Sequence, residues 1–196
     1  GLASARELTA LAKTARGLAK RSERKAAAGL KAIAATLDAA RAALPEIDYA
    51  TVNAGLRDLL ALAHVWPEAS PRQIKRGALR VERRARKAWR KGRKAGASAD
   101  YRHAWRQRER DRLYAVTLLG NAWPDRRPRR RGQSKKVVEV LGEERDAMLL
   151  ASRIEAAPPV AGEEKAAAGA LRALRQRQAQ LGRRARKAAA RLRAPR

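Results

Sequence analysis

Hydrophobic residues recur every three or four positions along most of the chain, which is the spacing of amphipathic helices. Helices are predicted over residues 4–44, 48–65, 71–94, 98–120, 134–154 and 163–193. The first of these can divide into two helices at the run KRSERK (residues 20–25) or at Gly29. No segment has the pattern of a strand, so the predicted fold is all-α, with antiparallel bundles of long helices.

Capping and breaking residues set the predicted boundaries. Asp48, and either Ser98 or Asp100, are expected to cap helices, because their side chains accept hydrogen bonds from free backbone N–H groups. Pro71 suits the first turn of a helix, where no backbone donor is needed. The basic segment AWPDRRPRRRG (residues 122–132) is expected to be a connection between helices. The expected stops are Pro45, Trp66 with Pro67, Gly120, and Pro158 with Pro159.

The last predicted helix has a three-four alternation of packing residues. They are Leu171, Leu174, Gln178, Leu181, Ala185, Ala188 and Leu192. This alternation is typical of a coiled-coil seam, so the helix is expected to act in oligomerisation or as a tail. The predicted division is a helical domain at residues 1–157, a linker at 158–162 and a basic C-terminal helix or tail at 163–196.

Positive charge dominates the composition. The chain has 47 Lys and Arg against 19 Asp and Glu, a net charge of +28. Self-repulsion of this size opposes compaction unless anions relieve it, which indicates a nucleic acid, another polyphosphate or an anionic membrane surface as partner.

There are no cysteines, which excludes disulfides and cysteine metal sites. No apolar run approaches the ~20 residues of a membrane span, and the N-terminus does not resemble a signal peptide, so the expected location is the cytoplasm.

The predicted helix 98–120 places four chemically distinctive residues on one face: His103, Arg106, Arg110 and Tyr114. Arginine offers planar paired donors to phosphate oxygens, and histidine and tyrosine add further donors. This face is therefore a candidate anion site. Periodicity leaves open the alternative that it is a solvated basic face with a histidine that only packs.

The predicted helix 71–94 is the most basic segment. Its polar side includes Arg80, Arg83, Arg84 and Lys87, and Glu82 is the only acid between residues 76 and 94. Like charges one turn apart repel, so an isolated helix gains nothing from this arrangement, whereas a bound polyanion stabilises it. We therefore favour binding over a merely solvated face here.

Two carboxylates in the segment GEERD (residues 142–146) are the other candidates for chemistry. Glu144 and Asp146 are expected to pair with Arg106 or Arg110 and to hold those side chains in place. The alternatives are a general base or metal ligands, but two histidines in the chain make a poor metal set. No GxSxG, HExxH or glycine-rich phosphate loop occurs, so no catalytic residue, metal or cofactor is predicted.

These segments together resemble one known family. The stretch YRHAWRQRERDRLYAVTLLGNAWP, followed by LGEERDAMLL, is similar to the CHAD domain, the "conserved histidine α-helical domain". That family has a helix of the form H-x-W-R-K-x-x-K-x-x-x-Y and a later L-G-x-x-x-D. The residues that match are His103, Trp105, Arg106, Tyr114, Trp123 with Pro124, Leu141 with Gly142, and Asp146. The segment GALRVERRARKAW also resembles the basic helix of the family, so the resemblance is specific over residues 77–154.

The resemblance implies two helical bundles with a basic channel between them, binding of inorganic polyphosphate and recruitment to polyphosphate granules. Lys136 and Arg145, on the helix 134–154, complete the candidate polyphosphate-binding set. The chain departs from the family at Gln107 and Arg110, where lysine is usual, and at Glu82, where an aromatic residue is common. The first-half helix that should pair with residues 101–114 is not found, so a fragment, or a reduced domain that self-associates into a homo-oligomer, is expected.

Three functions follow from these observations. The favoured one is a non-enzymatic protein that binds polyphosphate in the cytoplasm. The alternative is a sequence-nonspecific nucleic-acid binder, although no helix-turn-helix or RNA-binding signature is visible. The third is an enzyme acting on phosphate chains, with His103 as general acid or base, for which no nucleophile is apparent.

Overall fold

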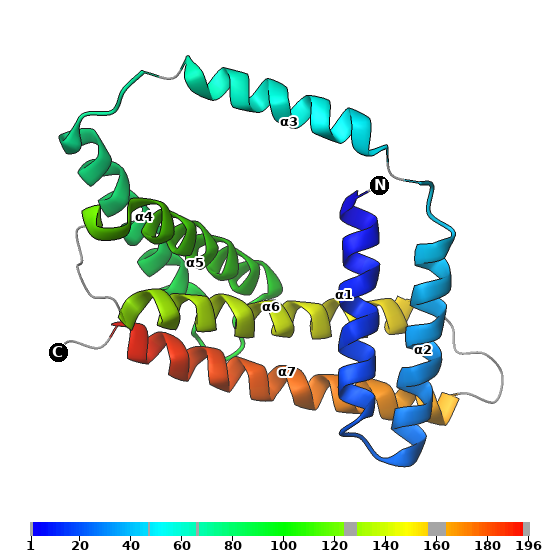
Figure 1. Ribbon diagram of the computed structural model, residues 1–196. Coiled ribbons are helices and arrows are strands. Elements are labelled where there is room, and N and C mark those ends of the chain that lie inside the picture. Colours follow the sequence, from blue (N-terminus) through cyan, green and yellow to red (C-terminus); the bar gives the residue numbers. More distant parts are fainter. Residues whose placement is uncertain (1, 47, 66, 124–128, 157–163, 194–196) are drawn as a thin grey trace.

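The computed structural model describes residues 2–46, 48–65, 67–123, 129–156 and 164–193. These residues form seven α-helices and one short 3-10 turn, with no strand among them (Figure 1). The elements are α1 (Leu2–Ala19), α2 (Arg24–Ala42), α3 (Tyr49–His64), α4 (Pro71–Gly92), α5 (Ala99–Leu119), η1 (Gly120–Ala122), α6 (Arg129–Ala156) and α7 (Glu164–Arg193). The prediction of an all-α fold with long antiparallel helices is confirmed.

Most predicted helix boundaries are confirmed. The break in the first segment falls in the KRSERK run, whereas Gly29 lies inside α2. The Asp48 side chain accepts from the backbone N–H groups of residues 50 and 51, and Ser98 is the N-cap of α5. Pro71 begins α4 behind a capping box of Ser70 and Gln73. The expected stops at Trp66, Pro158 and Pro159 lie outside the described residues, and α3 ends at His64.

One boundary was predicted wrongly. We expected a connection as far as residue 132 and a helix from residue 134, but α6 already begins at Arg129. The arginines that open α6 are strong helix formers, so the chain can become helical as soon as the last proline of the segment has been passed.

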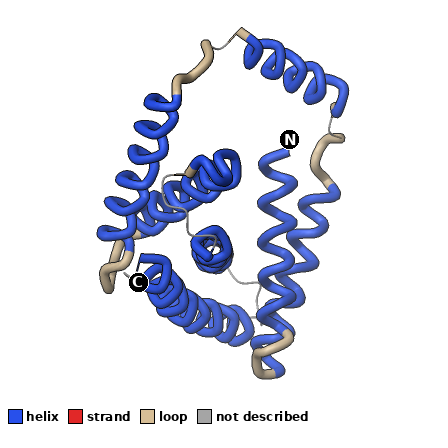
Figure 2. The backbone as a smooth tube through the Cα atoms, turned by 60° about the vertical axis from the view of Figure 1, so that its left-hand side comes forward, coloured by secondary structure: helices blue, strands red, loops and turns tan. Residues whose placement is uncertain are grey.

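Two apolar cores share α6 and α7, which run side by side through the molecule (Figures 1 and 2). The first core joins α1 and α2 to the C-terminal half of α6 and the N-terminal half of α7, around Leu11, Leu30, Leu150 and Leu174. The second joins α4 and α5 to the other halves of the same two helices, around Trp105, Val137 and Leu181. The seam predicted in the last helix therefore packs within the chain, mainly along α6.

The two cores meet where both shared helices lose their apolar pattern. In α6 the core residues stop at Leu141 and resume at Ala147, and the intervening residues 142–146 are GEERD. In α7 the half-buried Gln178 stands between Leu174 and Leu181. We call residues 142–146 and Gln178 the junction. A polar interruption at the same level of two paired helices leaves a region that apolar side chains do not fill.

Helix α3 is an exception to the packing of the other helices. It connects α2 to α4 as an arch above the rest of the molecule (Figure 2). None of its residues is buried, and its apolar stripe is open to solvent, with Leu56 53%, Leu59 63% and Leu60 65% exposed. The periodicity that predicts α3 is thus correct, although the described residues provide no core for the stripe.

Candidate anion-binding site

A cavity of about 550 Å³ lies at the junction, bounded by α5, α6, α7 and the segment that connects α4 to α5. Its lining includes seven Lys or Arg residues and His103, against the single carboxylate of Glu144. The seven cations are Lys94, Arg102, Arg106, Arg145, Arg175, Arg183 and Arg186. A hollow with this excess of positive charge is suited to an anion that carries several negative charges.

Helix α5 brings only part of its predicted face to the cavity. His103 and Arg106 line it. Arg110 is half-buried one turn further on, and its charge acts on both of them. Tyr114 is 62% exposed, further along α5 from the cavity. Only the N-terminal half of the predicted face therefore lines the cavity.

Arg106 is held in a strongly cationic environment. Burial lowers the pKa of its guanidinium, and the charges of Arg145 and Arg110 lower it further, while Asp146 opposes them. The Nε atoms of Arg106 and Arg110 are buried and have no hydrogen-bond partner among the described residues. Gly142 of α6 lies against Arg106, since a Cβ at this position would be in ordinary contact with Arg106 Nε at 3.6 Å. A buried donor without a partner costs free energy that an anionic acceptor recovers.

His103 is in its neutral form at pH 7. Burial lowers its pKa from the ordinary value, and the neighbouring cations Arg145, Arg106 and Arg110 lower it further. The side-chain nitrogen of Gln107 lies 2.9 Å from His103 Nε2. An amide nitrogen can only donate, so Nε2 accepts and carries no proton in this arrangement.

The carboxylates of the junction are placed differently from the prediction. Glu144 forms an ion pair with Arg102, one turn before the expected partner Arg106, because α5 passes α6 with residue 102 beside Glu144. Arg102 also donates from Nη1 to the backbone oxygen of Gly92 at 2.9 Å and lies over the ring of Trp105. The predicted pairing of Asp146 with Arg106 is not a direct ion pair in the structure, where Asp146 acts on Arg106 through its charge alone. Burial raises the pKa of both carboxyls, although their arginine neighbours partly offset it.

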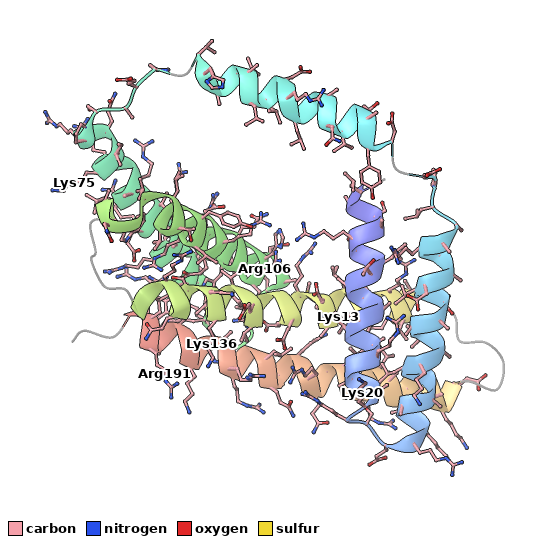
Figure 3. All side chains as sticks on the ribbon, viewed as in Figure 1. Lys13, Lys20, Lys75, Arg106, Lys136 and Arg191 are labelled. Carbon is pink, nitrogen blue, oxygen red and sulfur yellow. The ribbon has the colours of Figure 1, made fainter. Side chains whose placement is uncertain are left out.

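The remaining predicted residues are spread over the surface. Arg145 lines the cavity. Arg80, Arg83, Arg84 and Lys87 are exposed on α4 and do not line it. Lys136 is exposed on α6. It lies toward the N-terminal end of this helix (Figure 3) and does not line the cavity. The structure therefore brings together His103, Arg106 and Arg145 of the predicted set, with Arg110 next to them.

A buried ionic network was missed by the sequence analysis. Glu109 on α5 pairs with Arg193 at the end of α7 and accepts from Trp105 Nε1 at 3.4 Å. Arg112 pairs with Glu82 of α4 at 2.5 Å and donates to the buried Ser134 of α6. A signal was present, because positions 105, 109, 112 and 116 share one helical face. Charged residues between Trp105 and Val116 on a packing face indicate buried ion pairs.

Within the described part of the chain, no group of three or more His, Asp or Glu side chains could hold a metal ion. The same residues include no helix that is both long and apolar enough to cross a bilayer. Neither observation changes the description of the cavity as a site for an anion.

The fold and the cavity define an all-helical protein with a cationic site where two helical cores meet. Residues 1–155 match the CHAD domain, and the chain belongs to this family, whose members are generally non-catalytic binding domains. The match begins well before the segment that carries the sequence resemblance and ends within α6. Comparisons with curated proteins and with solved structures gave no match.

Proposed function

We propose that this protein binds inorganic polyphosphate, without catalysis, in the cavity at the junction, and that it associates with polyphosphate granules in the cytoplasm. The observation that carries the proposal is the Arg106 side chain. It lines a cavity with seven Lys or Arg residues and one carboxylate, and its buried Nε has no hydrogen-bond partner among the described residues. Phosphate oxygens supply both the negative charge and the acceptors that this arrangement lacks.

Polyphosphate fits the site better than a nucleic acid does. Proteins that bind single strands stack bases on exposed aromatic rings, but no Trp or Tyr is among the described residues that line the cavity. Recognition by charge without bases is what polyphosphate requires. The basic side of α4 is exposed, so a nucleic acid remains a competing polyanion there.

The first prediction concerns the two arginines of α5. Arg106→Gln with Arg110→Gln is expected to weaken binding of long-chain polyphosphate about 10- to 100-fold, because the charge-assisted hydrogen bonds of Arg106 in the cavity are lost together with the charge of the neighbouring Arg110. The matched control is Lys31→Gln with Arg41→Gln, which removes the same charge from exposed positions of α2. Titrations at one fixed salt concentration measure both variants, with heparin and duplex DNA as comparison ligands.

Each comparison has an outcome that contradicts the proposal. Equal weakening of polyphosphate binding in the two double variants would contradict the assignment of the site, since binding would then depend on net charge alone. Equal affinity of the wild type for all three polyanions would remove polyphosphate specificity. Tight RNA binding that polyphosphate does not displace would favour the nucleic-acid function.

The second prediction concerns pH. His103 is neutral in the free protein because burial and the nearby arginines lower its pKa. A bound polyanion stabilises the imidazolium and raises that pKa, so the protein takes up a proton on binding. Affinity is therefore expected to increase as the pH falls from about 8 to about 6, and to decrease as the pH rises again.

The control for this pH dependence is His103→Gln. Polyphosphate end groups titrate in the same range, but they do so equally with either protein. The ratio of the wild-type affinity to that of the variant, measured by calorimetry at each pH, therefore isolates the histidine. A ratio that stays constant between these pH values would show that His103 does not take up the proton.

A further inference from the structure

Helix α7 forms one side of the cavity, although it lies beyond the residues that match the CHAD domain. Its lining residues are Arg175, Gln178, Ala179, Gly182, Arg183 and Arg186. These positions recur at intervals of three and four, so they belong to one face of the helix. Three of the seven Lys or Arg residues that line the cavity thus come from α7.

The position of α7 beside the cavity is fixed at both ends. Near its N-terminus, Ala170 and Leu174 are buried in the first core. At its C-terminus, Arg193 forms a buried ion pair with Glu109 and approaches Glu82 at 3.6 Å. A helix held by an apolar core and by an ionic network keeps its cavity-facing side chains in a defined place.

Close packing brings α7 directly against residues 142–146 of α6. A Cβ at Gly182 would lie 3.2 Å from Glu144 Oε1 and 3.5 Å from an Arg102 terminal nitrogen. Glycine at this position therefore lets the backbone of α7 approach the Glu144–Arg102 ion pair. The arginines that follow Gly182 consequently reach the same space as the side chains of α5 and α6.

The cations of α7 differ in their counterions. Arg175 pairs with Glu155 at 2.8 Å. Arg183 and Arg186 form no direct ion pair with any described carboxylate, although the charge of Arg186 acts on Glu144 and opposes the rise of its pKa. These two arginines therefore remain available for an anion inside the cavity.

We propose that Arg183 and Arg186 bind the same polyphosphate chain as Arg106 and Arg145, so that the ligand lies between α7 and the α5–α6 side. This inference rests on the proposed function and extends the site to a helix outside the family match. A linear polyphosphate suits it, because a chain with phosphates in series can contact cations on opposite sides of a cavity of about 550 Å³.

The test uses two double variants of the full chain. Arg183→Gln with Arg186→Gln removes the cavity-facing cations, and Arg184→Gln with Lys187→Gln removes the same charge from exposed positions outside the cavity. Binding of long-chain polyphosphate is measured at several salt concentrations. The first variant is expected to lose about tenfold in affinity. Its slope of log affinity against log salt should fall by about 1.5, since two fewer phosphates are neutralised.

A chemical measurement on the wild type makes the test independent of how the variants fold. Phenylglyoxal modifies accessible arginines, and mass spectrometry locates the products. Polyphosphate is expected to protect Arg183 and Arg186 but not Arg184. Protection of Arg106 without protection of Arg183 and Arg186 would overturn the inference.

The outcomes separate this inference from the proposed function. If Arg106→Gln with Arg110→Gln weakens binding while the two α7 variants behave alike, the cavity binds polyphosphate without α7. If the α5 variant has no more effect than its own control on α2, the proposed function fails, and the inference fails with it.

Discussion

Glu109→Ala is expected to lower the free energy of unfolding by about 3–5 kcal/mol, the usual cost of removing one partner from a buried ion pair. Glu109 is 0% exposed and joins α5 to the last residue of α7 through Arg193. Burial raises the pKa of its carboxyl, although Arg193 and Arg112 oppose this effect. Alanine would leave Arg193 buried, with Glu82 at 3.6 Å as its remaining ion-pair partner, and would remove the acceptor of Trp105 Nε1.

Urea denaturation followed by far-UV circular dichroism measures this loss. Asp111→Ala is the matched control, because it removes the same charge from the same helix. Asp111 is 43% exposed, and its one ion-pair partner among the described residues is Arg108 three residues earlier, so its loss is expected to cost less than about 1 kcal/mol. Equal losses in the two variants would show that the Glu109 network is not a stabilising contact between α5 and α7.

Leu30→Ala is expected to lower the free energy of unfolding by about 2–5 kcal/mol, while Leu59→Ala should change it by no more than about 0.5 kcal/mol. Both leucines lie on apolar stripes of predicted helices. Leu30 is 0% exposed in the core shared by α1, α2, α6 and α7, whereas Leu59 on α3 is 63% exposed. Truncation leaves a cavity at the first site and only removes exposed surface at the second.

The same urea titrations compare these two variants at equal protein concentration. A loss for Leu59→Ala as large as that for Leu30→Ala would mean that α3 is packed against another surface in solution. A small loss for both would contradict the first core itself.

Helix positions could be predicted from the sequence because helix formation depends on nearby residues. Asp48, Ser98 and Pro71 act within one turn of their own positions, and they mark helix starts in the structure. The error at the start of α6 arose in a segment that mixes prolines with strong helix formers, where local signals conflict. The expectation of an anionic partner also follows from the sequence, since net charge does not depend on the fold.

The sequence by itself therefore determined an all-helical chain, the residues on each helical face and a strongly cationic character. Only the tertiary structure decided that Glu144 pairs with Arg102, that Glu109 meets Arg193 at a separation of 84 residues, and that α7 lines the cavity. It also decided that the stripe of α3 stays exposed while similar stripes form two cores. The physical reason is that a helix is set by hydrogen bonds and side chains four residues apart, whereas the partner of each face depends on how distant helices cross.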